Sequence, residues 1–390
     1  MIVARPSKIP QIFPLLLLSL IMLLAVEFSF RLYIKIADPQ TRREIAHYVA
    51  GTYTEKQAYI GHPFLQFSGR PRATLIGNDA LGDLPPFNNL GFIGKDFEFE
   101  KADHTIRIVA IGESTTADGY PAVMETFLNA NNPADSWSFE VLNFGMGYWT
   151  TAHAVSNFFL NVIDFSPDYV ILHHNWNEVK ARSSIVGFRN DYSHVLDYFH
   201  EPVIHDKYFI RASALYCFLK LSLSPRPDWW FLDKALMKEN AWSYIPTVDD
   251  ETNSYPFERN LRTIIDFSLL KGFRVVLTTQ PHSTNPDIPY GSTMPHMIRF
   301  NQILRRIAAS YGDAIVFVDL DREMTGKMEA VFRDLGHMDP AGIDFKAKKI
   351  GQAVLADFEQ NFRNRTQGPG YNSGTGKDTN QAQSNQNSRY

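Results

Sequence analysis

Ser114 lies directly after an apolar segment, where residues 106–111 give way to a Gly-Glu-Ser-Thr-Thr turn. In an open parallel sheet, the loops at the carboxyl ends of the strands carry the ligand site. A serine on such a loop, just before a helix, has an accessible hydroxyl, and the backbone N–H groups around it can bind an anion. This placement suits a nucleophile. A simple N-cap role for Ser114 or Thr115 would explain the turn as well.

Asp334 and His337 stand three residues apart near the other end of the chain, just before an amphipathic segment that starts at Pro340. At this spacing a carboxylate can orient an imidazole, and the imidazole can act as a base on a serine. Asp and His are also ordinary loop and cap residues, so the pair by itself is weak evidence for a catalytic site. Combined with a serine at a strand end, it predicts a Ser-His-Asp relay.

The segments between these residues alternate between apolar runs of strand length and stretches of helical period, which predicts a parallel α/β domain. The expected strands are 106–111, 139–144, 169–173, 274–279 and 315–318. The expected helices are 120–130, 152–163, 258–270, 296–311 and 340–362. Because the strands are rich in Val and Ile on both faces, helices should cover both sides of the sheet. We therefore expect a three-layer α/β/α sandwich around a five-stranded parallel sheet.

Four short blocks resemble, in order, those of the SGNH (GDSL-like) hydrolases, and the match runs over residues 88–358. GESTT is similar to the block that carries the nucleophile, VLNFGMGY to the second, LHHNWNEV to the third, and DLGH to the last. NNLGFIG also resembles an Asn-x-x-Gly-Phe-Arg-Gly lead-in of membrane-anchored members. The resemblance implies a flavodoxin-like SGNH hydrolase fold and a carboxylic ester hydrolase that needs no cofactor.

The resemblance also assigns roles to five residues. Ser114 would be the nucleophile, His337 the general base, and Asp334 the acid that orients it. Gly145 and Asn177 would be oxyanion donors alongside the Ser114 N–H.

Three positions depart from the family pattern. Asn175 stands where the third block usually has glycine, Glu178 where it has aspartate, and Ile93 where the lead-in has arginine. None of these changes removes a group that the mechanism needs, although Asn175 could narrow or re-aim the pocket. Without a glycine two residues after Ser114, the turn is not an α/β-hydrolase elbow. Without a following Gly-Lys-Ser/Thr, it is not a Walker-type phosphate loop.

The N-terminal segment 1–36 is expected to be a membrane anchor. Residues 12–26 are almost entirely apolar, and the run reaches the roughly 20 residues of a spanning helix if Glu27 lies near the interface. Arg5 and Lys8 precede it, which favours a cytoplasmic N-terminus and an exported catalytic domain, periplasmic or extracytoplasmic in a bacterium. A cleaved signal peptide is the alternative, but no clear small-x-small cleavage site follows the run.

The rest of the chain divides by composition. Residues 37–104 are expected to form a juxtamembrane arm packed on the hydrolase domain of residues 105–362. The aromatic-rich insertion 180–257 resembles a cap, in which Trp229 and Trp230 would form its own core or contact sugar rings or lipid. The polar tail, residues 363–390, should be disordered.

Charge and composition exclude several partners. A net charge of −4 without a basic stripe argues against nucleic acid. The single cysteine, Cys217, leaves no intramolecular disulfide. His173, His174 and His282 lie near the ends of predicted strands, yet no His, Asp and Glu set has the spacing of metal ligands, so we expect no metal and no cofactor.

Three classes of function remain open. The first, which the intact Ser114, Asp334 and His337 favour, is an acyl or acetyl esterase acting on acylated carbohydrate or lipid esters of the cell envelope or its surroundings. The second uses the same triad to transfer the acyl group to a sugar hydroxyl, as an O-acyltransferase in polysaccharide modification. The third is a non-catalytic envelope protein that binds its ligand with the same fold.

Overall fold

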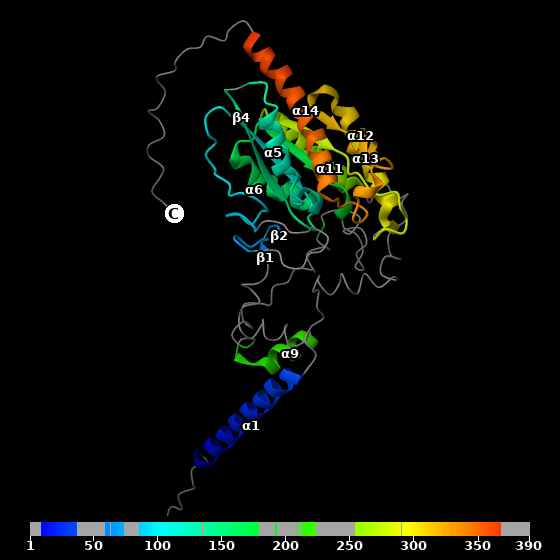
Figure 1. The fold of residues 1–390 in the computed structure, drawn as a ribbon. Coiled ribbons are helices and arrows are strands. Elements are labelled where there is room, and N and C mark those ends of the chain that lie inside the picture. The colour runs from blue at the N-terminus through cyan, green and yellow to red at the C-terminus, as the bar shows by residue number, and fades with distance from the viewer. Residues whose placement is uncertain are drawn as a thin grey trace, which may run out of the picture.

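A five-stranded parallel sheet forms the centre of the protein (Figure 1). The computed structural model describes residues 9–36, 59–62, 64–73, 86–134, 136–178, 192, 209, 212–223, 254–289 and 291–367. Across the sheet, the strands lie in the order β4 (Ser138–Gly145), β3 (Thr105–Gly112), β5 (Tyr169–His173), β6 (Arg274–Thr278) and β7 (Val316–Val318). Counted along the chain, this is the flavodoxin-like order 2-1-3-4-5.

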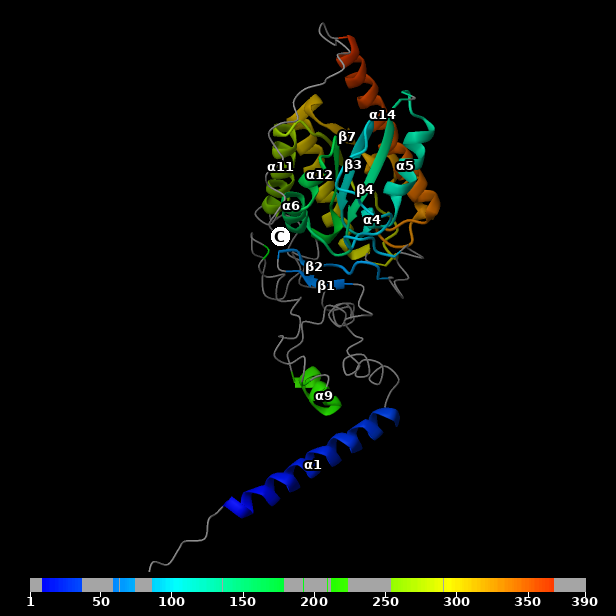
Figure 2. The same cartoon turned by 90° about the vertical axis from the view of Figure 1, so that its left-hand side faces the viewer.

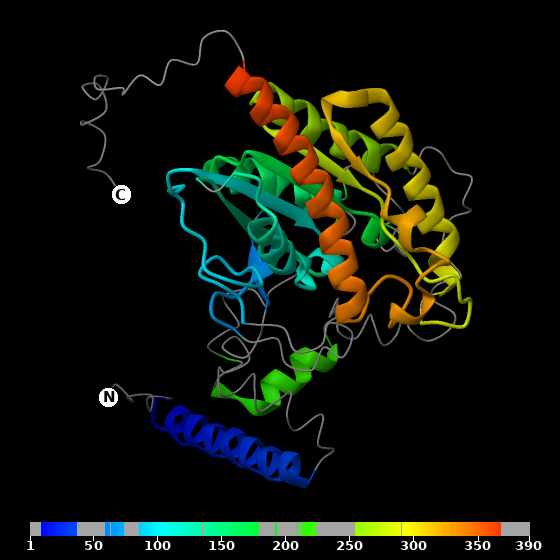
Figure 3. The same cartoon turned by 45° about the horizontal axis from the view of Figure 1, so that its top comes forward.

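Helices cover both faces of the sheet, which confirms the expected three-layer sandwich (Figure 2, Figure 3). One face is covered by α5 (Tyr120–Ala130) and α14 (Pro340–Gln367). The other is covered by α6 (Thr151–Leu160), α11 (Tyr255–Leu270) and α12 (Met294–Tyr311). Short elements complete the domain: α4 (Ser114–Ala117), α13 (Leu320–Met324) and the 3-10 turns η1 (Val162–Phe165), η6 (Gly291–Thr293), η7 (Gly312–Ala314) and η8 (Glu329–Val331).

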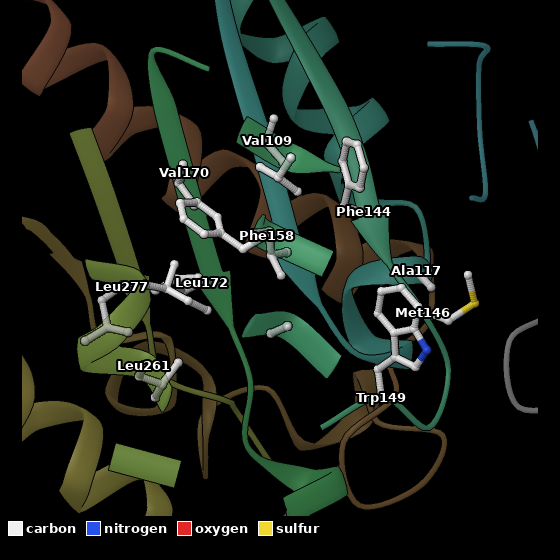
Figure 4. Close-up of a cluster of buried hydrophobic side chains, with 14 of the residues drawn as sticks. Val109, Ala117, Phe144, Met146, Trp149, Phe158, Val170, Leu172, Leu261 and Leu277 are labelled. Atoms are coloured by element: carbon white, nitrogen blue, oxygen red, sulfur yellow. The ribbon is translucent and has the colours of Figure 1, made fainter. Parts of the chain in front are cut away.

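Each central strand is apolar on both faces because its side chains alternate between two cores. Val109 packs with Phe158 of α6 in the core beneath α6, α11 and α12 (Figure 4). Its neighbour Ile108 faces the opposite core, which includes Met124 of α5 and Val354 of α14. All five side chains are fully buried. The alternation fixes the strand register, and the register brings the carboxyl ends of β3, β4 and β5 to one edge of the sheet.

The expected elements match the observed ones closely. The ranges 120–130 and 169–173 coincide with α5 and β5. The expected helix 152–163 ends at Leu160, after which the chain tightens into the 3-10 turn η1. α11 begins at Tyr255, inside the range 180–257 expected for the insertion.

The segment before β3 contributes to the main core. A hairpin of β1 (Tyr59–His62) and β2 (Gln66–Gly69) is antiparallel. Phe67 of this hairpin and Phe92 of the NNLGFIG lead-in are buried against Trp149. Asn88, at the start of the lead-in, accepts the N–H of Phe92 at 3.0 Å and shapes the turn. In the part of this segment that the structure describes, the lead-in therefore serves packing.

The N-terminal helix α1 (Ile9–Ile36) is long and apolar enough to cross a membrane, with a 24-residue candidate span at 13–36. It lies beside α9 (Ala214–Leu223) in all three views (Figure 1, Figure 2, Figure 3). Glu27 of α1 accepts hydrogen bonds from Ser213 Oγ at 2.7 Å and from the Ala214 N–H at 2.7 Å. Residues at the start of α9 thus donate hydrogen bonds to Glu27, the one acidic residue in the apolar helix.

Several expectations fall outside the described residues. Most of the insertion, including Trp229 and Trp230, lies there, as does the tail beyond residue 367. Residues 363–367 of the expected tail continue α14.

Candidate active site

Ser114 begins the short helix α4 directly after β3. The N-cap of α4 is Glu113, so the alternative N-cap role for Ser114 does not hold. The turn is tight: a Cβ on Gly112 would lie 2.0 Å from Thr116 Oγ1 and 2.6 Å from the His173 carbonyl oxygen. Glycine is therefore required where the strand bends into α4, and this bend leaves Ser114 half-buried at the sheet edge.

The structure brings Ser114, His337 and Asp334 together. His337 Nε2 lies 2.9 Å from Ser114 Oγ, and His337 Nδ1 lies 2.8 Å from Asp334 Oδ2. The other oxygen of Asp334 accepts the N–H groups of Gly336 at 3.0 Å and His337 at 2.7 Å. Burial would raise the pKa of Asp334, but these hydrogen bonds outweigh it and lower the pKa. The pair is thus a carboxylate fixed against one imidazole nitrogen, with a hydroxyl at the other.

Glu113 is a site residue to which the sequence reasoning gave no role. Its carboxyl accepts three backbone N–H groups of the third block, those of Asn175 and Trp176 at 2.7 Å and that of Asn177 at 2.6 Å. Burial raises the pKa of Glu113 to about 7, although the three N–H groups favour the charged form. The residue before Ser114 therefore holds the loop that carries Asn177.

The two expected oxyanion donors lie close to this turn, but each already donates a hydrogen bond. Asn177 Nδ2 donates to the Trp149 carbonyl at 3.0 Å, which leaves its second N–H for a ligand. The Gly145 N–H donates to Asn143 Oδ1 at 2.9 Å. Gly145 packs so tightly that a Cβ would lie 2.5 Å from the Ala117 nitrogen. In the same block, the Gly147 N–H forms no hydrogen bond with any described residue.

Two of the three departures from the family pattern have structural partners here. The Asn175 side chain points into the protein, where Nδ2 donates to Asn301 Oδ1 at 2.8 Å and to the Met297 carbonyl at 3.0 Å. Glu178 accepts the N–H of Thr151 at 2.5 Å and the hydroxyl of Tyr192 at 2.5 Å, which stabilises the N-terminus of α6. The Asn175 side chain is therefore directed toward α12.

Lys346 of α14 is a second residue that the sequence reasoning missed. It is fully buried, and its ammonium donates to the Thr115 carbonyl and, at 2.9 Å, to Asp118 Oδ2. It also lies 4.7 Å from the centre of the Tyr120 ring. Burial lowers the pKa of Lys346, and Asp118 opposes that effect. α14 thereby anchors the carboxyl end of α4, the helix that begins with Ser114.

Two of the other histidines singled out from the sequence lie against polar side chains. No group of three His, Cys, Asp or Glu residues within the described ranges could hold a metal ion. His173 Nδ1 lies 2.6 Å from Thr278 Oγ1, and burial lowers its pKa well below the usual value. His282 Nδ1 lies 3.0 Å from Asp321 Oδ1.

Comparisons with known proteins give similarities in fold at low identity. No family profile and no curated protein sequence matches the chain. A GDSL-like lipase from Bacteroides thetaiotaomicron is 15% identical over 65% of this chain and 89% of its own, with a TM-score of 0.38. An acetylxylan esterase from Geobacillus stearothermophilus is 17% identical over 64% and 93%, with a TM-score of 0.39. A lipase/acylhydrolase from Enterococcus faecalis is 14% identical over 65% and 96%, with a TM-score of 0.38. Solved structures similar to this chain thus include GDSL-like acylhydrolases and acetylxylan esterases.

Proposed function

We propose that the protein is a serine ester hydrolase in which Ser114, His337 and Asp334 form the catalytic triad. The observation that carries the proposal is the pair of contacts made by one imidazole, 2.9 Å to Ser114 Oγ and 2.8 Å to Asp334 Oδ2. A serine hydroxyl is a weak nucleophile unless an adjacent base takes its proton, and the base needs a third group to orient it. The three groups lie in series at hydrogen-bond distance.

The reaction proceeds in two stages. His337 accepts the Ser114 proton as Oγ bonds to the ester carbonyl carbon, and the carbonyl electron pair moves to oxygen. The oxyanion is held by the Ser114 N–H, the free N–H of Asn177 Nδ2 and a glycine N–H of the second block. For Gly145 to be that glycine, its bond to Asn143 must be exchanged for one to the oxyanion. The alcohol leaves with the proton from His337, and water activated by His337 then releases the acid.

We propose an acyl or acetyl ester of envelope carbohydrate or lipid as the substrate, because α1 would hold the catalytic domain at a membrane surface. Its candidate span of 24 residues is long enough for a bilayer core of about 30 Å. Arg5 and Lys8 before the span favour export of the rest of the chain. N-terminal sequencing of the mature protein distinguishes a retained anchor, which begins near Met1, from a removed signal peptide.

The test of the reaction compares the full chain in detergent with its Ser114→Ala variant on short-chain aryl esters. We expect hydrolysis by the wild type and a loss of several orders of magnitude in kcat in the variant. Ser268→Ala is the matched control, because Ser268 is buried on α11 and its hydroxyl has no partner among the described residues. Equal activity of Ser114→Ala and the wild type would refute the proposal. Added sugar acceptor that diverts product from free acid to acylated sugar would indicate a transferase.

Asn177→Ala tests the oxyanion site. Loss of one oxyanion donor typically costs about 10²–10³ in kcat, and we expect a loss in that range. The thermal midpoint reports whether the Trp149 contact made by the same amide matters for folding. Full activity of this variant would show that the third block does not bind the oxyanion.

A further inference from the structure

One buried amide side chain joins the two segments that carry the proposed nucleophile and base. Gln280 follows β6 and is fully buried. Its Oε1 accepts the Thr115 hydroxyl at 3.0 Å, and its Nε2 lies 3.4 Å from the Gly336 carbonyl oxygen and 3.2 Å from that of Pro281. Thr115 adjoins Ser114 in sequence and Gly336 adjoins His337. The same side chain therefore contacts both neighbours of the reacting pair.

Asn301 of α12 fixes Gln280 in turn. Asn301 Oδ1 accepts the Gln280 N–H at 2.9 Å, and Asn301 Nδ2 donates to the Gln280 carbonyl at 2.8 Å. Asn301 Oδ1 also accepts Asn175 Nδ2 at 2.8 Å, which ties in the third block. Three strand-end segments, those after β3, β5 and β6, and the loop that carries His337 are thus joined through two amides.

The network lies beside Ser114 and His337 and can therefore control the distance between them. The side chains of Thr115, Asn175, Gln280 and Asn301 are all fully buried, so water does not compete for their hydrogen bonds. Buried polar networks of this kind rigidify their surroundings, and a buried polar group that loses its partner in one is destabilising. In catalysis, a misplacement of about 1 Å can cost about 100-fold in rate. Neither Thr115 nor Gln280 needs to touch substrate to influence turnover.

We propose that Gln280 and Thr115 are positioning residues that set the separation between Ser114 Oγ and His337 Nε2, and that Asn301 holds Gln280 for this task. The inference rests on the proposed triad, because it assigns no chemistry of its own. Asn175, which stands in place of the family's glycine, belongs to the same network.

A double-mutant cycle in the full chain tests the proposal. Thr115→Val removes the hydroxyl while keeping the shape, and Gln280→Met removes the amide. We expect each to lower kcat by roughly 10- to 100-fold with KM changed less than about threefold. The double variant should lose about as much as Gln280→Met alone, since that change already breaks the contact with Thr115. Thr115→Ser keeps the donor and should retain kcat within about threefold of wild type.

Two controls keep the outcomes distinct. Asn157→Ala removes another fully buried amide, on α6, whose oxygen accepts a hydrogen bond from Asn161 just after that helix. This variant should lower the thermal midpoint without lowering kcat. The proposal is overturned if the Thr115→Val and Gln280→Met losses multiply, or if these variants melt earlier but keep wild-type kcat. A wild type that neither hydrolyses esters nor reacts with a fluorophosphonate at Ser114 would overturn the proposed function itself, and the positioning role with it.

Discussion

Among the described residues there are two histidine–aspartate pairs, both in the segments that follow β6 and β7, and they differ in what lies around them. In His337–Asp334 the imidazole Nδ1 to carboxylate distance is 2.8 Å, and in His282–Asp321 it is 3.0 Å. His337 presents its other nitrogen to Ser114, whereas His282 Nε2 makes no hydrogen bond with any described residue. Both pairs therefore place an imidazole beside a carboxylate. They differ in the serine hydroxyl that lies against the second nitrogen of His337.

The two carboxylates also differ in their other hydrogen-bond partners. Asp334 is held by backbone N–H groups and by its histidine, so the histidine is its one side-chain partner among the described residues. Asp321 accepts Arg305 Nη2 at 2.6 Å and the Thr325 hydroxyl at 2.7 Å as well as His282. A carboxylate already neutralised by a guanidinium has less effect on an imidazole proton. The second pair is thus suited to joining β6 to α13.

The largest expected contrast is in catalysis. Asp334→Asn should lower kcat by about 10⁴, the effect known for loss of the orienting carboxylate in a serine triad, with little change in fold. Asp321→Asn should leave kcat within a few-fold of wild type. Aryl ester hydrolysis measures both, with circular dichroism as the check on folding. Comparable losses of kcat in the two variants would show that the second pair also serves the reaction.

A second contrast is in stability. Arg305→Leu removes the one arginine that contacts both of the partly buried carboxylates Asp319 and Asp321, and leaves Asp319 only the exposed Arg322, so we expect a loss of about 3 kcal/mol in the free energy of unfolding. The adjacent Arg306→Leu is the matched control, because its pair with Glu258 is more exposed and should cost less than about 1 kcal/mol. Urea titration measures both. Equal shifts in the two variants would argue against a stabilising role for the cluster around Asp321.

The smallest expected effect is the response to acid. Burial would raise the pKa of Asp321, but hydrogen bonds from His282, Arg305 and Thr325 lower it from 3.8 to about 2. Because the folded pKa lies below the unfolded value, the stabilisation is complete above pH of about 4 and is lost as the pH falls toward 2. The wild type should lose roughly 2 kcal/mol more across this window than Asp321→Asn. Parallel curves for the two proteins would contradict this assignment.

The sequence was enough to predict the layers of the fold, because the pattern that indicates each strand or helix lies within one short segment. Each predicted strand is a short run that is apolar on both faces, and such a run has few other places in a folded chain. It also predicted that Ser114 and His337 would meet, from the serine at a strand end, the Asp-x-x-His spacing and the family resemblance. Their roles in catalysis stay predictions until the variants are measured.

The residues that the sequence reasoning missed act through tertiary contacts. Lys346 lies within an amphipathic helix, where a lysine ordinarily faces water, and its burial depends on Asp118 and Thr115 far away in sequence. Gln280 is one of several polar residues after β6, and its contact with Thr115 spans 165 positions. The signal for Glu113 was present in the Gly-Glu-Ser turn, but what it holds became visible only with the third block in place.

The contact between Glu27 and α9 has a consequence for the order of events during synthesis. Glu27 and Ala214 are 187 positions apart, so at about 5–20 residues per second the ribosome reaches α9 roughly 10 to 40 seconds after the apolar helix. During that interval Arg31, four residues away, is the local partner of the carboxylate at 2.7 Å. If α1 spans a membrane, its hydrogen bonds with the start of α9 therefore form late. They form only after the ribosome has made α9, long after it has made α1.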